Sequence, residues 1–258
     1  MTKEQFILST IRPMAEYTFP FLSSIVGIQE PKVGEQEPKV GEHVGTGLRA
    51  MVNGRRAVLT AEHVIREALK YPSGFALSAG YGRKPFIVSG NVGLDSVRDL
   101  AIYYLPADFP YDRPGIGFWP EDRIQRTTER IDTDYLFVHG FPASRSRFLH
   151  LVEGLASRSL PYGAMQRLDV PDLQAHEFAV EFDPKGIRPA DGPKGESVVD
   201  PHGLSGSPVW RIGISGRSRN EWSPELSLLV GCVTQWSPER GILIATSSTS
   251  FKELIGRH

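Results

Sequence analysis

A serine lies between two glycines in the segment GLSGS at residues 203–207. Flexible glycines allow backbone N–H groups to turn toward a developing oxyanion while the hydroxyl of Ser205 faces a cleft. A serine hydroxyl is a weak nucleophile by itself, so it needs a histidine base and an acid that orients the base. The segment therefore predicts nucleophilic catalysis, provided that both partners occur elsewhere in the chain.

Both partners occur upstream of the serine. His63 lies in TAEHV (60–64), directly after an apolar segment, and Asp99 opens the apolar segment DLAI (99–102). Each has a simpler interpretation, as a hydrogen-bonded structural histidine and as an acid that begins a strand. Asp95 competes for the role of the acid. We favour Asp99, because a carboxylate at the start of a buried strand can reach a histidine.

A β-hairpin is predicted to position the histidine. Asn53-Gly54 favours the positive φ angles of a type I′ turn, and alternating apolar segments flank it. A short helix is expected to begin near His63. Further strands are predicted at 75–78, 86–89, 100–105, 135–140, 148–158, 177–182, 207–212, 226–234 and 242–246. Many short strands with turns between them indicate an all-β fold rather than βαβ units.

The two ends of the chain and two loops complete the expected organisation. A helix is predicted from Thr2 to about Thr10 and should end before Pro13, followed by a strand at 19–29. A terminal helix should be capped by Ser250 with Glu253 and should end at Gly256. The tandem repeat QEPKVGE at 29–42 reads as an exposed loop, and the long segment 183–203 as a functional loop.

Composition excludes several classes of protein. The 258 residues carry 29 Lys and Arg against 30 Asp and Glu, a net charge of −1, which argues against nucleic-acid binding by bulk phosphate neutralisation. A single cysteine excludes an internal disulfide framework and a cysteine-cluster zinc site. Long apolar runs and a secretory signal pattern are both lacking, so we expect no membrane span and a cytoplasmic location.

The segments TAEHV, DLAI and GLSGSPV, in the order His, Asp, Ser, resemble the three signatures of the chymotrypsin/trypsin-like serine proteases. The pattern is most similar to bacterial trypsin-like peptidases, including the HtrA-type protease domain, without a PDZ domain. The resemblance implies two antiparallel six-stranded β-barrels and a short C-terminal helix. It places an N-terminal extension at 1–18, the first barrel at 19–125 and the second at 126–258.

The resemblance also assigns the parts of the site. It makes His63, Asp99 and Ser205 the catalytic triad and gives the oxyanion hole to the N–H groups of Gly203 and Ser205. Leu204 stands where trypsin-type zymogens have the aspartate that captures a new N-terminus, so activation by simple clipping is not expected. The expected substrate-binding residues are Val199, Asp200, Thr234, Gln235, Trp236 and Gly241.

These features predict a serine endopeptidase that needs neither a cofactor nor a metal and acts on proteins or peptides. Val199 at the pocket base and Trp236 in its wall favour a small or medium apolar side chain at the cleavage site, whereas a shift by one residue would bring Asp200 into the pocket and favour Arg or Lys. A cytoplasmic protease must be restrained, so we expect narrow specificity or control by a regulatory protein. The alternative is a pseudoprotease that keeps the fold as a protein-binding module.

Overall fold

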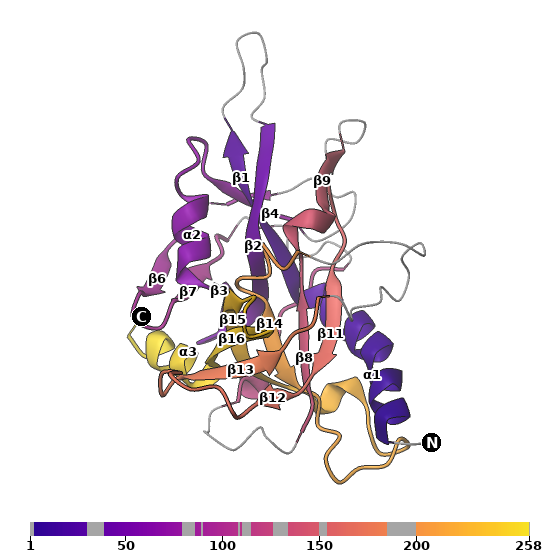
Figure 1. The fold of residues 1–258 in the computed structure, drawn as a ribbon. Helices are drawn as coiled ribbons and strands as arrows, with labels where there is room; N and C mark the ends of the chain where they lie inside the picture. The colour runs from indigo at the N-terminus through magenta and orange to yellow at the C-terminus, as the bar shows by residue number, and fades with distance from the viewer. Residues whose placement is uncertain are drawn as a thin grey trace.

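Two antiparallel β-sheets make up most of the computed structural model (Figure 1). The structure describes residues 3–29, 39–78, 86–88, 90–107, 109, 115–125, 134–149, 154–184 and 200–257. Most of the duplicated segment and of the long loop after residue 183 lies outside these ranges, as does Val199.

The first sheet has seven strands in the order β5-β4-β1-β2-β3-β7-β6. Its central hairpin turns at Asn53 and Gly54, whose φ angles of 50° and 69° confirm the predicted type I′ geometry. The strands are β1 (Leu22–Gln29), β2 (Lys39–Val52), β3 (Arg55–Thr60), β4 (Phe75–Ser78), β5 (Phe86–Ile87), β6 (Val92–Asp95) and β7 (Leu100–Tyr104).

The second sheet has seven strands in the order β11-β8-β14-β15-β16-β13-β12. These are β8 (Leu136–Gly140), β11 (Leu160–Ala164), β12 (Gln166–Arg167), β13 (Glu177–Glu181), β14 (Pro208–Arg211), β15 (Leu228–Ser237) and β16 (Ile242–Ser247). The all-β prediction is confirmed, but each sheet has seven strands instead of six, because a two-residue strand, β5 or β12, extends one edge. The domain boundaries given above stay a prediction.

The segment predicted as one strand at 148–158 forms a hairpin instead. β9 (Ser146–Leu149) pairs antiparallel with β10 (Gly154–Ser157), with Leu149 opposite Gly154. The chain therefore reverses between them. A run of strand-forming residues does not by itself reveal such a reversal, since both arms have the same local preference.

The N-terminal helix is longer than its sequence indicated. α1 (Lys3–Thr18) continues through Pro13 and packs against β8 and β11 (Figure 1). A proline inside a helix costs about 3 kcal/mol, yet tertiary packing can offset such a cost. Here Met14 is fully buried in the central core cluster and Ile11 packs against it, so burial of this face explains why the helix does not end before Pro13.

The other helices and turns are short. They are α2 (Glu62–Ala68), α3 (Ser248–Ile255), and the 3₁₀ turns η1 (Phe19–Phe21), η2 (Glu121–Arg123), η3 (Ala143–Arg145) and η5 (Pro224–Leu226). The predicted cap of the terminal helix is wrong: Ser247 is the N-cap, and Ser250 is buried inside the helix. The helix begins earlier because β16 leads into it directly, and it does end at Gly256.

One core cluster joins the two sheets. It includes Trp119 and Trp210, both fully buried with ring centroids 5.7 Å apart, together with Phe251 and Leu254 of α3. Each sheet also has a hydrophobic cluster of its own. The shared cluster fixes the two sheets relative to each other, as a site assembled from both of them requires.

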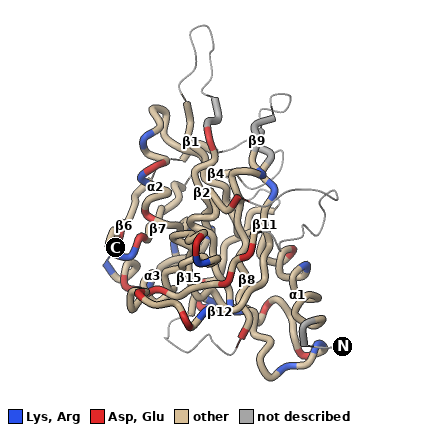
Figure 2. Tube along the Cα trace, viewed as in Figure 1, with Lys and Arg blue, Asp and Glu red and all other residues tan. Residues whose placement is uncertain are grey.

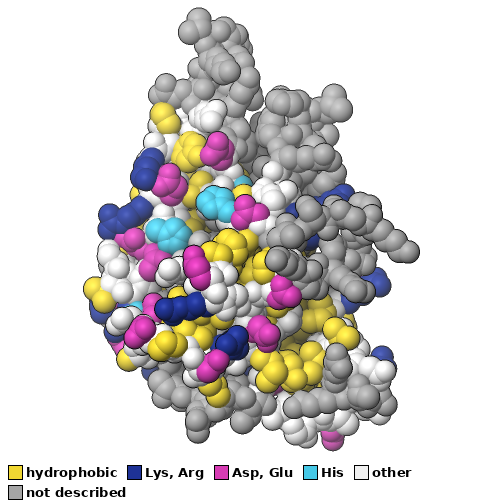
Figure 3. Space-filling view, viewed as in Figure 1, with side chains coloured by type: hydrophobic (Ala, Val, Ile, Leu, Met, Phe, Trp, Pro, Cys, Tyr) yellow, Lys and Arg dark blue, Asp and Glu magenta, His cyan; other side chains and the backbone are white. Residues whose placement is uncertain are grey.

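Charged residues of both signs are interspersed along the described chain (Figure 2), and their side chains are intermingled on the face shown in Figure 3. This distribution agrees with the net charge of −1. Among the described helices, none is long and apolar enough to span a bilayer.

His139 is a buried histidine that links α1 to the second sheet. Its Nδ1 lies 2.7 Å from Thr18 Oγ1, whose own proton is donated to the Met14 carbonyl, so Nδ1 carries a hydrogen and Nε2 accepts from Ser159 at 2.8 Å. These two hydrogen bonds favour the neutral form of the His139 ring. Burial lowers the pKa of His139 to about 3, from 6.5.

Stability should fall as the pH is lowered below 6.5. The unfolded chain takes up a proton at His139 near pH 6.5, whereas the folded chain does not do so until about pH 3, and His43 behaves alike, because burial lowers its pKa to about 4. Each histidine should therefore reduce the free energy of unfolding by about 2 kcal/mol between pH 6.5 and pH 5. Denaturant titrations at pH 7 and pH 5 measure this loss.

A matched pair of variants assigns the effect. Replacing His139 by Gln should make the pH dependence shallower, and replacing His43 by Gln should do the same, because each change removes one of the two histidines whose pKa is lowered by burial. Equal stability of the parent protein at pH 7 and pH 5 would contradict the prediction.

Candidate active site

His63 and Asp99 form a hydrogen-bonded pair. His63 Nδ1 lies 2.7 Å from Asp99 Oδ2, and the backbone N–H of His63 donates to Asp99 Oδ1 at 2.9 Å. The side chains are 47% and 32% exposed, so the ring lies at the surface with its Nε2 edge free for a second partner. A carboxylate on Nδ1 fixes the tautomer in which Nε2 is unprotonated and can act as a base.

The local structure explains this pairing. The chain passes from β3 into α2 at Ala61, which places His63 in the first turn of α2. Asp99 ends the turn between β6 and β7 and has a φ of 52°. Backbone hydrogen bonds from β3 to β7, and from Glu62 N–H to the Asp99 carbonyl at 3.1 Å, hold the two segments together.

Asp95, the competing acid, has other partners. Its carboxylate accepts hydrogen bonds from the backbone N–H and the side chain of Arg98, at 3.2 and 3.1 Å, and lies 3.6 Å from Arg257. It is buried and belongs to the base of the turn. The carboxylate that contacts His63 is therefore that of Asp99.

Ser205 lies on a loop that is hydrogen-bonded to both sheets. Its carbonyl accepts a hydrogen bond from Thr46 N–H at 2.9 Å, and Gly206 N–H donates to the Val233 carbonyl at 2.7 Å. A Cβ at Gly45 would meet both the Val64 side chain and the Ser205 carbonyl, so the serine lies beside the start of α2. The hydrogen bonds of the described residues do not include one between Ser205 and His63, a contact that is often loose without substrate.

Two glycines give the loop its shape. Gly206 has a φ of 83°, and a Cβ there would collide with the Thr46 carbonyl and the Thr60 hydroxyl. Gly203 has a φ of 88°, and a Cβ there would lie 2.6 Å from the His43 ring. Within the described part of the chain, neither Gly203 N–H nor Ser205 N–H donates to a backbone carbonyl. The backbone hydrogen bonding of the loop therefore uses neither donor.

His43 supports the same loop, a role that was not predicted from the sequence. Its Nε2 lies 3.3 Å from the Gly203 carbonyl, which can only accept, so Nε2 carries the proton and Nδ1 accepts from Ser24 Oγ at 2.8 Å. The Thr46 hydroxyl donates to the same carbonyl at 3.2 Å. The available signal was a histidine two residues before GTG (45–47), in a strand otherwise suited to burial.

Comparison of the whole chain with known proteins identifies the architecture. No protein-family model matches the sequence, and no curated protein matches it. Among solved structures, an inactivated protease paralogue of the scabies mite aligns with a TM-score of 0.53 and 16% identity, covering 93% of this chain and 94% of that one. The chain has the chymotrypsin-like fold. A tobacco vein mottling virus protease aligns with a TM-score of 0.47 and 12% identity, covering 90% and 78% of the two chains.

Within the chymotrypsin-like fold, Leu204 anchors the serine loop by burial. It is 1% exposed and belongs to the apolar cluster of the second sheet, with Val209 and Val233. The His202 carbonyl accepts from Ala143 N–H at 2.7 Å, and the Pro201 carbonyl accepts from Leu204 N–H at 2.9 Å. Apolar burial of Leu204 and these backbone hydrogen bonds therefore hold the loop, in place of an ion pair at this position.

Of the expected substrate-binding residues, Thr234, Gln235 and Trp236 lie on β15, and Gly241 lies just before β16. Thr234 is buried and donates to the Ile244 carbonyl, Gln235 is exposed, and Trp236 packs against the apolar cluster of the second sheet. Gly241 has a φ of 62° and precedes β16. Asp200 is exposed, and its carboxylate accepts from His202 N–H at 2.9 Å.

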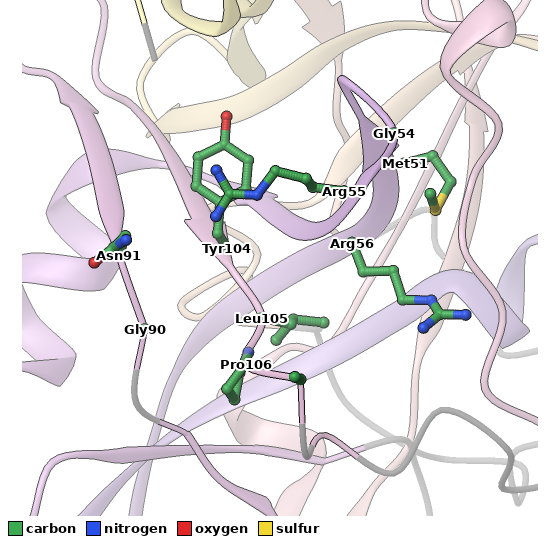
Figure 4. Close-up of a pocket in the computed structure, with 10 residues that line it drawn as sticks. Met51, Gly54, Arg55, Arg56, Gly90, Asn91, Tyr104, Leu105 and Pro106 are labelled. Carbon is green, nitrogen blue, oxygen red and sulfur yellow. The ribbon is translucent and has the colours of Figure 1, made fainter.

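A separate cavity of about 700 Å³ lies at the far end of the β2–β3 hairpin (Figure 4). Arg55 stacks on the Tyr104 ring at 4.0 Å, and Arg56 points away from it toward Phe118 (Figure 4). The two guanidinium groups do not converge, and no member of the His63 site lines this cavity. Among the described residues, no group of three His, Cys, Asp or Glu side chains is placed to hold a metal ion.

Proposed function

We propose that the protein is a serine endopeptidase that cleaves proteins or peptides by acyl transfer. The observation that carries this proposal is the hydrogen-bonded pair of His63 and Asp99, beside a loop that leaves the N–H groups of Gly203 and Ser205 available. The chymotrypsin-like fold is compatible with this chemistry but does not by itself establish it. The narrower assignment to bacterial, HtrA-type peptidases rests on the three sequence signatures.

In the proposed reaction the Ser205 hydroxyl attacks the scissile carbonyl while His63 Nε2 takes its proton. The new Oγ–C bond gives a tetrahedral oxyanion, which the N–H groups of Gly203 and Ser205 stabilise. Collapse breaks the C–N bond, His63 returns the proton to the leaving amine, and an acyl-enzyme remains. Water then attacks the acyl carbon with His63 again as the base, the Oγ–C bond breaks, and His63 returns the proton to Ser205 as the acid product leaves. Asp99 stabilises the imidazolium in both steps.

Labelling with a fluorophosphonate probe tests this function. The probe should form a covalent adduct, and peptide mapping should locate the adduct at Ser205. Denatured protein is the control, since labelling that depends on the site must disappear with the fold. A natively folded chain that takes up no probe would contradict the proposal.

The second candidate is a pseudoprotease that binds proteins without cleaving them. The lack of a hydrogen bond from Ser205 to His63 favours it, and the mite protein described above is itself called inactivated. The intact set of His63, Asp99 and Ser205 argues against it. Absence of labelling, together with retained binding of a protein partner, would establish this alternative. A regulatory protein partner is also compatible with an active enzyme, because the activity of a cytoplasmic protease must be restrained.

Removal of residues 1–18 should destabilise the protein without activating it. Met14 would leave the core cluster, and His139 would lose its partner Thr18. Loss of one such core side chain costs about 2–5 kcal/mol. Leu204 also cannot pair with a newly formed N-terminus. Thermal unfolding and turnover of the shortened chain measure both effects.

Single substitutions provide matched controls for the deletion. Met14→Ala should lower the melting temperature, and Leu8→Ala on the same helix should not, because Leu8 is 65% exposed. An order-of-magnitude rise in turnover after removal of residues 1–18 would contradict the prediction.

We expect cleavage after small or medium apolar residues. This specificity is supported by Trp236, whose indole packs into an apolar cluster, and by the engagement of the Asp200 carboxylate in its own turn. Trp236→Ala should widen the accepted range toward larger apolar residues, as a peptide-library profile would record. Asp200→Asn is the control and should not change the profile. Strong selection for Arg or Lys that Asp200→Asn removes would overturn this expectation.

A further inference from the structure

Glu62, the residue before His63, is an acid buried where the chain turns from β3 into α2. It is 6% exposed, and a buried carboxylate is costly unless it is paired and hydrogen-bonded. Glu62 meets this requirement in two ways. Its Oε1 accepts from the Arg66 guanidinium, one turn along α2, and from the Ser96 hydroxyl at 3.1 Å.

Ser96 belongs to the turn that carries Asp99. This turn joins β6 to β7, and Arg66 Nη2 also reaches the Ser96 hydroxyl, at 3.1 Å. Glu62, Arg66 and Ser96 therefore form a closed triangle between α2 and the turn, which we call the Glu62 clamp. The contact joins the segment of the histidine to the segment of the acid at a point three residues from Asp99.

The turn needs such support because of its backbone. Asp99 has a φ of 52°, a conformation that costs a residue with a side chain about 1–2 kcal/mol and persists where the surroundings impose it. Apart from the Glu62 clamp, the hydrogen bonds that join α2 to this turn among the described residues end on Asp99 itself, from Glu62 N–H, His63 N–H and His63 Nδ1. A second attachment at Ser96 holds the other end of the turn against α2.

The opposite side of the turn is attached to α3 and β16. Arg98 pairs with Glu253 at 2.5 Å and with Asp95 at 3.1 Å, and its carbonyl accepts from the Thr246 hydroxyl at 2.9 Å. The β6–β7 turn is thus held on both sides, and Glu62 provides the contact with α2. The sequence alone indicates no role for Glu62, since a charge beside a histidine base has no obvious function by itself.

We propose that Glu62 is a positioning residue for the His63–Asp99 pair. With Arg66 and Ser96 it fixes α2 against the turn, so that Asp99 Oδ2 stays at hydrogen-bonding distance from His63 Nδ1. The proposal rests on the proposed protease function, since that function gives the pair its purpose. The Glu62 carboxylate neither faces the substrate nor exchanges a proton in the reaction.

The test compares Glu62→Ala, Glu62→Gln and Ser96→Ala with Glu67→Gln. Glu67 lies on the same helix, is half-exposed and pairs with Lys70, so it is a matched control outside the clamp. Glu62→Ala and Ser96→Ala should lower kcat and the rate of fluorophosphonate labelling by about 10- to 100-fold, because small misplacements of catalytic groups have effects of this size. KM should stay within about twofold of the parent value, since the clamp does not bind substrate.

Two further results distinguish positioning from simple destabilisation. Glu62→Gln can still accept from Ser96, so it should retain more activity than Glu62→Ala. The double variant Glu62→Ala/Ser96→Ala should be no slower than the slower single variant, because both changes open the same triangle. The far-downfield proton resonance of His63 Nδ1–H, bonded to Asp99, should shift or broaden in both single variants and stay unchanged in Glu67→Gln.

The resonance also separates this proposal from the protease function. If the parent protein shows the resonance but takes up no probe, the proposed function fails, and a change of the resonance in Glu62→Ala still supports the clamp. Parent-like kcat and an unchanged resonance in a folded Glu62→Ala variant would overturn the proposal. A loss of activity that matches the loss of folded protein, with the resonance unchanged, would overturn it as well.

Discussion

Ser205→Ala is expected to abolish both covalent labelling and peptide cleavage while the protein remains folded. The Ser205 hydroxyl makes no hydrogen bond that the described structure depends on, and its side chain is only partly buried, so little packing is lost. His63→Ala should reduce the rate on the order of 10⁴-fold, because Ser205 then has no base. Probe incorporation by mass spectrometry and thermal unfolding measure the two effects.

Ser144→Ala is the matched control for this experiment. Ser144 is an exposed serine next to the site, and its hydroxyl reaches the Asp200 carbonyl at 3.4 Å. Loss of this hydroxyl should leave labelling and turnover near the parent values. Labelling that persists at the parent rate in Ser205→Ala would show that Ser205 is not the nucleophile.

Asp99→Asn is expected to lower kcat on the order of 10⁴-fold, because an amide can donate to Nδ1 and would favour the wrong tautomer of His63. Asp95→Asn should affect stability more than catalysis. The Asp95 carboxylate contacts Arg98 and Arg257 and lies away from the His63 ring. Rates at saturating peptide, compared with melting temperatures, separate the two kinds of effect.

The two aspartates serve as controls for each other, since both are acids in the same β6–β7 turn region. A larger kinetic loss in Asp95→Asn than in Asp99→Asn would assign the acid to Asp95. Equal losses that follow the amount of folded protein would show that neither carboxylate has a specific role at His63.

Local signals in the sequence predicted much of the fold. The turn at Asn53-Gly54 was identified from residue type, because few residues tolerate two successive positive φ angles. Most strands of both sheets occur near their predicted positions, since period-two patterns and β-branched residues report directly on a half-buried strand. The chymotrypsin-like architecture was implied by the resemblance of three short motifs to a known family of proteases.

The errors occur where packing overrides local preference. α1 continues through Pro13 because Met14 and Ile11 are buried against the second sheet. The terminal helix is capped at Ser247 because β16 determines where it begins. The segment 148–158 is divided into a hairpin, although its residue types suit a continuous strand.

The candidate site divides in the same way. The sequence by itself determined which residue types could carry out acyl transfer, namely His63, Asp99 and Ser205, because that chemistry requires a base, an acid and a hydroxyl. Only the tertiary structure decided that Asp99, and not Asp95, contacts His63, and that His43 and Glu62 hold the surrounding loops. These contacts join residues far apart in the chain, and their existence depends on how the two sheets pack, a long-range property that no local pattern encodes.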